Sequence, residues 1–174
     1  MSATAPARGE PLPVLVGWLG YAGALPFVAT ALAARADPAH ASLWAFALLA
    51  YGAVIVSFVG ALHWGVAMSA SGLDGGFAQR RSVLYAWSVV PCLLAWAALL
   101  THAVFLGGTV WAAALLVLAF VAHYRFDRPL ARAMRLPAWY LPLRLRLTLV
   151  ACLSLLSLDL PLQTAAATAV PVLR

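Results

Sequence analysis

Five long apolar runs dominate this sequence of 174 residues and limit the folds open to it. A helix needs about 20 mostly apolar residues to cross the hydrocarbon core of a bilayer. Short polar segments separate the five runs from one another. We therefore expect an all-α integral membrane bundle with about five transmembrane helices, at residues 12–34, 43–68, 83–100, 106–124 and 139–158.

The composition excludes the other large classes of protein. Hydrophobic residues make up 65% of the chain and charged residues 9%, whereas a soluble domain averages roughly 45–50% and about 25%. A disordered chain needs low hydrophobicity and high charge. No polar segment is long enough for a separate soluble domain, so we expect one membrane domain over residues 1–174. Pro161 and Pro171 interrupt the apolar tail after Asp159, and whether that tail re-enters the membrane stays open.

The charges indicate how the bundle lies in the membrane. All eleven basic residues are arginines, against five acidic residues. A basic balance can indicate nucleic-acid binding, but these arginines lie between apolar runs, so we expect the lipid bilayer as partner and no nucleic acid. Positive residues favour the cytoplasmic side, which predicts a cytoplasmic N-terminus and an external C-terminus. The cytoplasmic side then holds nine arginines and the other side holds Arg35 and Arg174; the nine are Arg8, Arg80, Arg81, Arg125, Arg128, Arg132, Arg135, Arg144 and Arg146.

The polar segment at residues 125–138 has a pattern of its own. Arg128, Arg132 and Arg135 recur at helical spacing, and Leu130 and Met134 fit another face. Such a pattern is typical of a short basic helix that lies on the inner leaflet of a membrane. The arginine-rich, lysine-free composition favours a bacterial origin.

Small residues recur in the first two runs at spacings that let helix backbones approach closely. One interpretation is packing within the bundle. The other is an interface with a second copy or with another inner-membrane protein. The residues concerned are Gly20, Gly23, Ala53, Ser57, Ala61 and Gly65.

Ionisable residues at membrane depth are the best functional indicators in such a chain. We expect His63, Asp127 and one of Arg144 or Arg146 to lie together around a cavity open to the cytoplasm, with Trp64 and His123 nearby. The two histidines are able to ligate haem or a metal, or to relay protons. The alternatives are a hydrogen-bonded core His63, an interfacial His123, and arginines that reach lipid phosphates.

Familiar catalytic patterns are absent from the sequence. There is no P-loop, no paired Glu-x-x-His, no Cys-x-x-Cys and no nucleophile elbow. Cys92 and Cys152 lie singly inside apolar runs and are interpreted as small buried residues. We therefore expect no catalytic residue, no metal site and no cofactor. The alternative is a haem held by His63 and His123. These features favour a protein that is not an enzyme.

Four blocks of sequence carry a resemblance to a known family. They are residues 19–27, residues 51–65, residues 85–96, and Asp127 together with residues 137–148. Between about Leu15 and Leu158 the chain resembles the domain-of-unknown-function family number 3429, which includes relatives of eukaryotic transmembrane protein 69. The resemblance implies a small multi-pass protein of bacterial inner membranes, with mitochondrial relatives, and implies no reaction.

Two functions agree with these features. The first is a non-enzymatic protein that assembles or stabilises another membrane complex, because catalytic groups are scarce and two helices carry small-residue faces. The alternative is a protein that binds or carries a small ligand such as haem, a quinone or a lipid.

Overall fold

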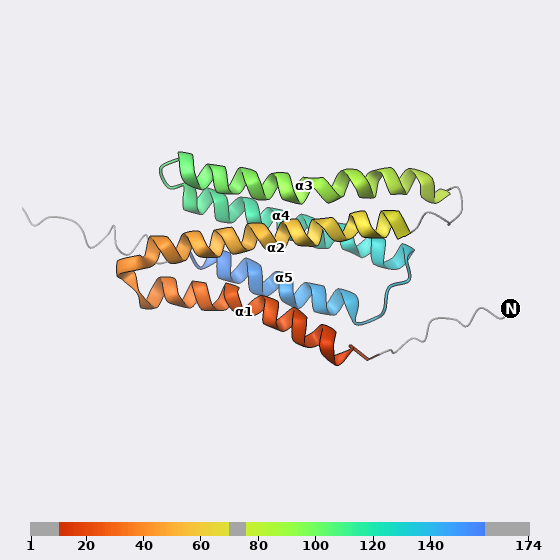
Figure 1. Cartoon of the computed structure of the whole chain (residues 1–174), viewed down its shortest axis with the longest axis horizontal. Coiled ribbons are helices and arrows are strands. Elements are labelled where there is room, and N and C mark those ends of the chain that lie inside the picture. Colours follow the sequence, from red (N-terminus) through yellow and green to blue (C-terminus); the bar gives the residue numbers. More distant parts are fainter. Residues whose placement is uncertain (1–10, 70–75, 159–174) are drawn as a thin grey trace, which may run out of the picture.

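The computed structural model describes residues 11–69 and 76–158, and this part of the chain consists of helices joined by short turns, without a strand. The expected all-α bundle is thus confirmed (Figure 1). The short 3-10 segment η1 (Pro38–His40) joins the first two helices. The five helices are α1 (Val14–Ala36), α2 (Ala41–Ser69), α3 (Gly76–Val104), α4 (Gly108–Ala133) and α5 (Tyr140–Leu156).

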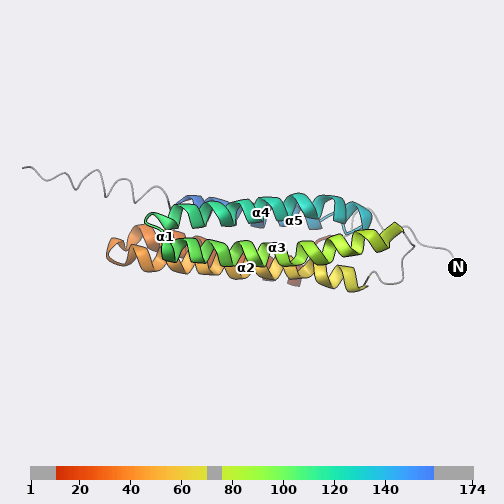
Figure 2. The ribbon, with the colours of Figure 1, turned by 90° about the horizontal axis from the view of Figure 1, so that it is seen from above.

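The helices lie side by side along one long axis, and neighbours in sequence run in opposite directions (Figures 1 and 2). Packing continues from α2 to α3, from α3 to α4, from α4 to α5, and from α5 through α1 back to α2. Helix α2 also contacts α4 across the bundle. This cross-contact is the one that builds the site described below.

The dimensions and the surface of the bundle fit a membrane. Within the described residues, four helices are long and apolar enough to cross one: Val14–Ala36, Pro38–Ser69, Arg81–Val104 and Gly108–Ala133. Helix α5 has 17 residues, about 26 Å at 1.5 Å per residue, and is the shortest of the five. Large apolar side chains such as Trp18, Trp96 and Trp111 are mostly exposed. A bilayer would solvate this apolar exterior with lipid tails.

The core is built from side chains that reach the bundle axis from all five helices. Phe27 of α1 contacts Tyr51 and Phe120 edge to face, with ring centroids 5.0 and 5.9 Å apart. The Tyr51 hydroxyl donates a 2.7 Å hydrogen bond to the Gly23 carbonyl oxygen. Fully buried side chains fill the remaining space: Leu48, Leu49, Val56, Leu116 and Leu155.

The C-terminal end of α4 differs from the sequence-based expectation. The separate basic surface helix predicted at residues 125–138 is wrong, because α4 continues without a break to Ala133. Asp127, Leu130 and Ala131 face the bundle and are buried, so inward contacts outweigh the arginines on the outer face. The helix ends where the Leu136 amide donates to the Ala131 carbonyl at 2.9 Å and Arg135 adopts a positive φ of 51°, the geometry of a Schellman cap.

The small residues of α1 and α2 have different positions in the bundle. A Cβ on Gly20 would contact Leu143 and Leu147, Ala53 is buried in the core, and the Ser57 hydroxyl bonds back to the Ala53 carbonyl. The interpretation that the small residues pack within the bundle is wrong for the C-terminal half of α2, where Ala61 and Gly65 are exposed. Each lies two positions from His63, which is about 200° around the helix, so an inward His63 turns both outward.

Gly60 packs more closely than the other glycines of α2, and it supplies a test of the packing. A Cβ at Gly60 would lie 3.0 Å from the Ser88 carbonyl oxygen and 3.1 Å from Pro91 of α3. We expect Gly60→Leu to destabilise the bundle by about 1–3 kcal/mol, the usual range for overpacking. The matched control is Gly65→Leu, because a Cβ there meets no atom of the described residues within 4 Å. Thermal unfolding in detergent measures both, and equal midpoints would contradict the packing of α2 on α3.

Candidate functional site

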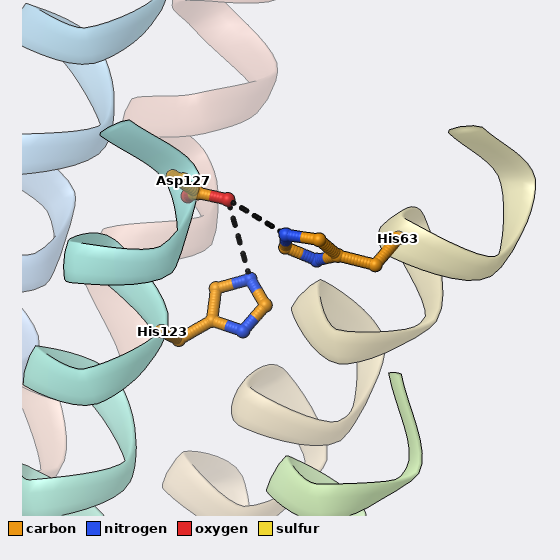
Figure 3. A group of neighbouring side chains, drawn as sticks. All are labelled: His63, His123 and Asp127. Atoms are coloured by element: carbon orange, nitrogen blue, oxygen red, sulfur yellow. Dashed lines mark ion pairs between the residues drawn. The ribbon is translucent and has the colours of Figure 1, made fainter. Parts of the chain in front are cut away.

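Two histidines and an aspartate meet where α2 crosses α4 (Figure 3). His123 and Asp127 lie one turn apart on α4, and His63 faces them from α2. The Nε2 atom of His63 is 3.3 Å from Asp127 Oδ1, and the Nε2 atom of His123 is 3.6 Å from the same oxygen. Two imidazoles thus point at one carboxylate oxygen.

Arg144 of α5 completes this group from the other side of the carboxylate. Its Nε donates a 2.8 Å hydrogen bond to Asp127 Oδ2. This bond is short and charge-assisted, which places it among the stronger hydrogen bonds of proteins. We call His63, His123, Asp127 and Arg144 the polar site. Its four side chains connect α2, α4 and α5.

The polar site is closed and its hydrogen bonding is incomplete. His63 and His123 are each 1% exposed and Asp127 is 0% exposed. Among the described residues, no hydrogen bond is made by either nitrogen of His63, by either nitrogen of His123, or by Asp127 Oδ1. The contacts at 3.3 and 3.6 Å are therefore close approaches without good hydrogen-bond geometry. A buried polar atom without a partner costs about 1–3 kcal/mol, so the arrangement needs a physical reason.

Aromatic side chains enclose the polar site. Trp87 of α3 stacks on Phe126 with ring centroids 4.4 Å apart, and its ring is 6.4 Å from that of His123. The Phe126 ring lies 5.7 Å from that of His63, and the Tyr140 side chain lies beside Asp127 and Arg144. Sequence reasoning did not assign Trp87, Phe126 or Tyr140 to the site, because an aromatic residue in or beside an apolar run carries no distinguishing signal.

Two residues expected near the site lie elsewhere. Trp64 is 48% exposed and contacts Tyr85 edge to face, since it follows the inward His63 and points to the outside of α2. Arg146 is exposed and donates to the Tyr21 hydroxyl at 3.2 Å. It is two positions from Arg144, about 200° around α5, so only one of the two arginines faces Asp127.

The expected cavity is displaced from the polar site. A cavity of about 190 Å³ lies between α1, α2, α4 and α5, and its lining includes Arg144 and Thr148 beside apolar residues such as Phe120 and Leu62. His63, His123 and Asp127 do not line it. The expectation that the cluster surrounds a cavity is therefore wrong, because tight contact between α2 and α4 closes the space around the imidazoles.

The polar site lies toward one end of the bundle. His63 is about 9 Å along the axis from the C-terminal end of α2, and Arg144 is about 6 Å from the start of α5. Helix α2, with 29 residues, is about 43 Å long, whereas the hydrocarbon core of a bilayer is about 30 Å thick. A bundle centred in a bilayer would hold the site close to the boundary between hydrocarbon and headgroups.

The whole described bundle matches one protein family. The family described as "Protein of unknown function (DUF3429)" matches residues 12–158. The chain belongs to this family. The resemblance drawn from the sequence blocks is therefore confirmed, and the matched range contains all four residues of the polar site.

A named relative extends the comparison to animals. The chain is 36% identical over 148 residues to a protein named Transmembrane protein 69 from Xenopus tropicalis. The aligned part covers 85% of this chain and 54% of the relative, so the chain spans about half the length of that protein. No solved structure matches the chain.

Proposed function

We propose that this member of the DUF3429 family is a non-enzymatic membrane protein that binds a small ligand at the polar site. The observation that carries the proposal is the set of unpaired polar atoms on His63, His123 and Asp127, all of them buried. Buried polar groups almost always have partners. A bound ligand that pairs these atoms would remove the cost of burying them.

The closed geometry favours binding over catalysis. Three of the four side chains are at most 1% exposed, and Arg144 is 13% exposed on its side chain. Substrate turnover requires repeated entry and exit, and these side chains leave little room for it. A tightly held ligand needs entry only once, or during folding.

A haem ligand, the alternative considered for the two histidines, fits the geometry poorly. In a bis-histidine haem the porphyrin plane lies midway between the two ligating nitrogens. Asp127 Oδ1 is 3.3 and 3.6 Å from these nitrogens, so it lies almost in that plane. The centroids of the two imidazole rings are also only 4.6 Å apart. The site therefore supports a ligand much smaller than haem.

An assembly or stabilising role for another inner-membrane protein is a second candidate. The observation that favours it is the outward position of Ala61 and Gly65 on α2, where none of the described residues packs against Gly65. Small exposed residues allow a second transmembrane helix to approach closely. Co-purification of one defined membrane protein with the wild type, lost in Ala61→Leu, would support this role.

We further propose a multi-pass arrangement in a bacterial inner membrane, with five passes, the N-terminus in the cytoplasm and the C-terminus outside. Arginines support this orientation, because Arg81, Arg132 and Arg144 belong to the same end of the bundle while Arg35 belongs to the other. A reporter fused to the C-terminus is expected to be active on the external side only. Cytoplasmic activity would contradict either the odd number of passes or the orientation.

Native mass spectrometry of the detergent-purified protein tests the binding function. We expect the wild type to carry one additional mass in a one-to-one ratio, and the double variant His63→Leu with His123→Leu to lack it. The control is His102→Leu, because His102 contacts Thr109 at the opposite end of the bundle and should leave the added mass unchanged. A wild type purified gently from its native membrane without any added mass would contradict the proposed function.

A further inference from the structure

We infer that the small ligand is a divalent transition-metal ion of the zinc type, held by His63 Nε2, His123 Nε2 and Asp127 Oδ1. This inference rests on the proposed function and names the chemical class of its ligand. It departs from the sequence-based expectation of no metal site. The reason is that the sequence did not show His123 and Asp127 sharing a helix face that α2 meets with a third ligand.

The separations between the three ligand atoms fit one metal ion. Each pair lies within 4.8 Å, and the two pairs that include Asp127 Oδ1 are 3.3 and 3.6 Å apart. Zinc lies about 2.0–2.2 Å from histidine nitrogen and carboxylate oxygen in tetrahedral geometry. Ligand atoms around it are then about 3.3–3.5 Å apart. The two shorter separations agree with this edge length, and only the two nitrogens need to move closer together.

The ligand types select the class of metal. Imidazole nitrogen suits zinc, copper, iron and nickel, whereas magnesium and calcium prefer sites made of oxygen. Two neutral histidines with one carboxylate form a common set of three protein ligands for zinc. The same coordination would satisfy both Nε2 atoms and Oδ1, which otherwise have no hydrogen-bond partner among the described residues.

The surroundings hold the ligands in place. Arg144 binds Asp127 Oδ2 at 2.8 Å, which fixes the carboxylate with Oδ1 turned toward the histidines. Trp87 and Phe126 pack on the rings of His123 and His63 and restrict their rotation. A hydrogen bond to a metal ligand, such as that of Arg144 to Asp127, typically changes metal affinity 10–100-fold. A protein that merely tolerated two buried histidines would not need this support.

Charge balance indicates what occupies the remaining coordination position. A divalent ion, Arg144 and Asp127 with two neutral imidazoles sum to two positive charges. Three protein ligands leave a fourth position open, and hydroxide or another small anion there would lower the excess to one. The site lies near the end of the bundle, which reduces the free-energy cost of the remaining positive charge, because a charge is most costly at the bilayer centre.

Metal analysis of the purified full chain tests this inference. We expect about one zinc per chain after purification, or after addition of Zn²⁺ and removal of the excess. Asp127→Asn should bind Zn²⁺ at least tenfold more weakly, while His102→Gln should bind as the wild type does. Thermal midpoints recorded with and without Zn²⁺ are expected to rise with the metal in the wild type only.

Cobalt supplies a readout that does not depend on the variants folding. Co²⁺ added to the metal-free wild type should give the visible absorption of a tetrahedral site with nitrogen and oxygen ligands, and Zn²⁺ should abolish it. A wild type that binds neither Zn²⁺ nor Co²⁺ would overturn the metal assignment. If native mass spectrometry then shows an organic ligand, the proposed binding function stands without the metal; if it shows no ligand, both are wrong.

Discussion

Replacing Asp127 with alanine is expected to lower the free energy of unfolding by about 3–5 kcal/mol, the usual cost of removing one partner from a buried ion pair. Asp127 is 0% exposed and accepts a hydrogen bond from Arg144. Without the carboxylate, the Arg144 guanidinium would remain partly buried with no counter-charge, and both histidines would lose their common neighbour. Reversible unfolding in mixed detergent micelles measures the change.

A second aspartate provides the matched control. Asp37 lies at the other end of the bundle, where its exposed carboxylate accepts hydrogen bonds from Trp44 and His40. The Trp44 bond, together with those from His40, lowers the pKa of Asp37, yet solvent is available to replace these partners. Asp37→Ala should therefore destabilise much less than Asp127→Ala. Equal losses would contradict the special role of the buried carboxylate.

The second large effect is expected at Phe27, where Phe27→Ala should cost roughly 2–4 kcal/mol. The buried ring contacts Tyr51 and Phe120 and lines the cavity between α1, α2, α4 and α5, which its removal would enlarge. Comparable changes in soluble proteins cost about 3–5 kcal/mol. We expect a smaller destabilisation in lipid, because the transfer of apolar surface contributes little when the unfolded helices also lie in lipid.

Val28, the residue after Phe27, provides a control that distinguishes the loss of packing inside the bundle from the loss of apolar surface. Val28 is 42% exposed on the outside of α1, so Val28→Ala removes apolar surface that faces lipid. We expect its unfolding midpoint in the same micelles to stay close to that of the wild type. A loss at Val28 as large as the loss at Phe27 would show that α1 does not pack on the bundle in this register.

The helices were predictable because long apolar runs have few alternatives in a membrane protein. The sequence also allowed the prediction that Asp127 pairs with only one of Arg144 and Arg146, since residues two apart on a helix point in nearly opposite directions. The choice of Arg144 was not, because it depends on how α5 is rotated against α4. That rotation follows from the packing of side chains such as Leu143 and Thr148, which are buried.

The sequence misled where charges and apolar residues share a helix. Arg125, Arg128 and Arg132 made residues 125–138 resemble a polar segment between two spans, yet their helix continues α4. Because the helix was expected to end at residue 124, the spacing of four residues between His123 and Asp127 did not predict that the two side chains share one helix face. Recognising that Asp127 and Leu130 face inward required the position of α2, which only the three-dimensional structure supplies.

The polar site itself is most directly tested by nitrogen NMR of the chain labelled with ¹⁵N-histidine. The chain has four histidines, of which His63 and His123 face Asp127 while His40 and His102 lie at the opposite end of the bundle. We expect Asp127→Asn to shift the ring nitrogen signals of His63 and His123 and to leave those of His40 and His102 in place. Unchanged signals from all four histidines would contradict the convergence of α2 and α4 on one carboxylate.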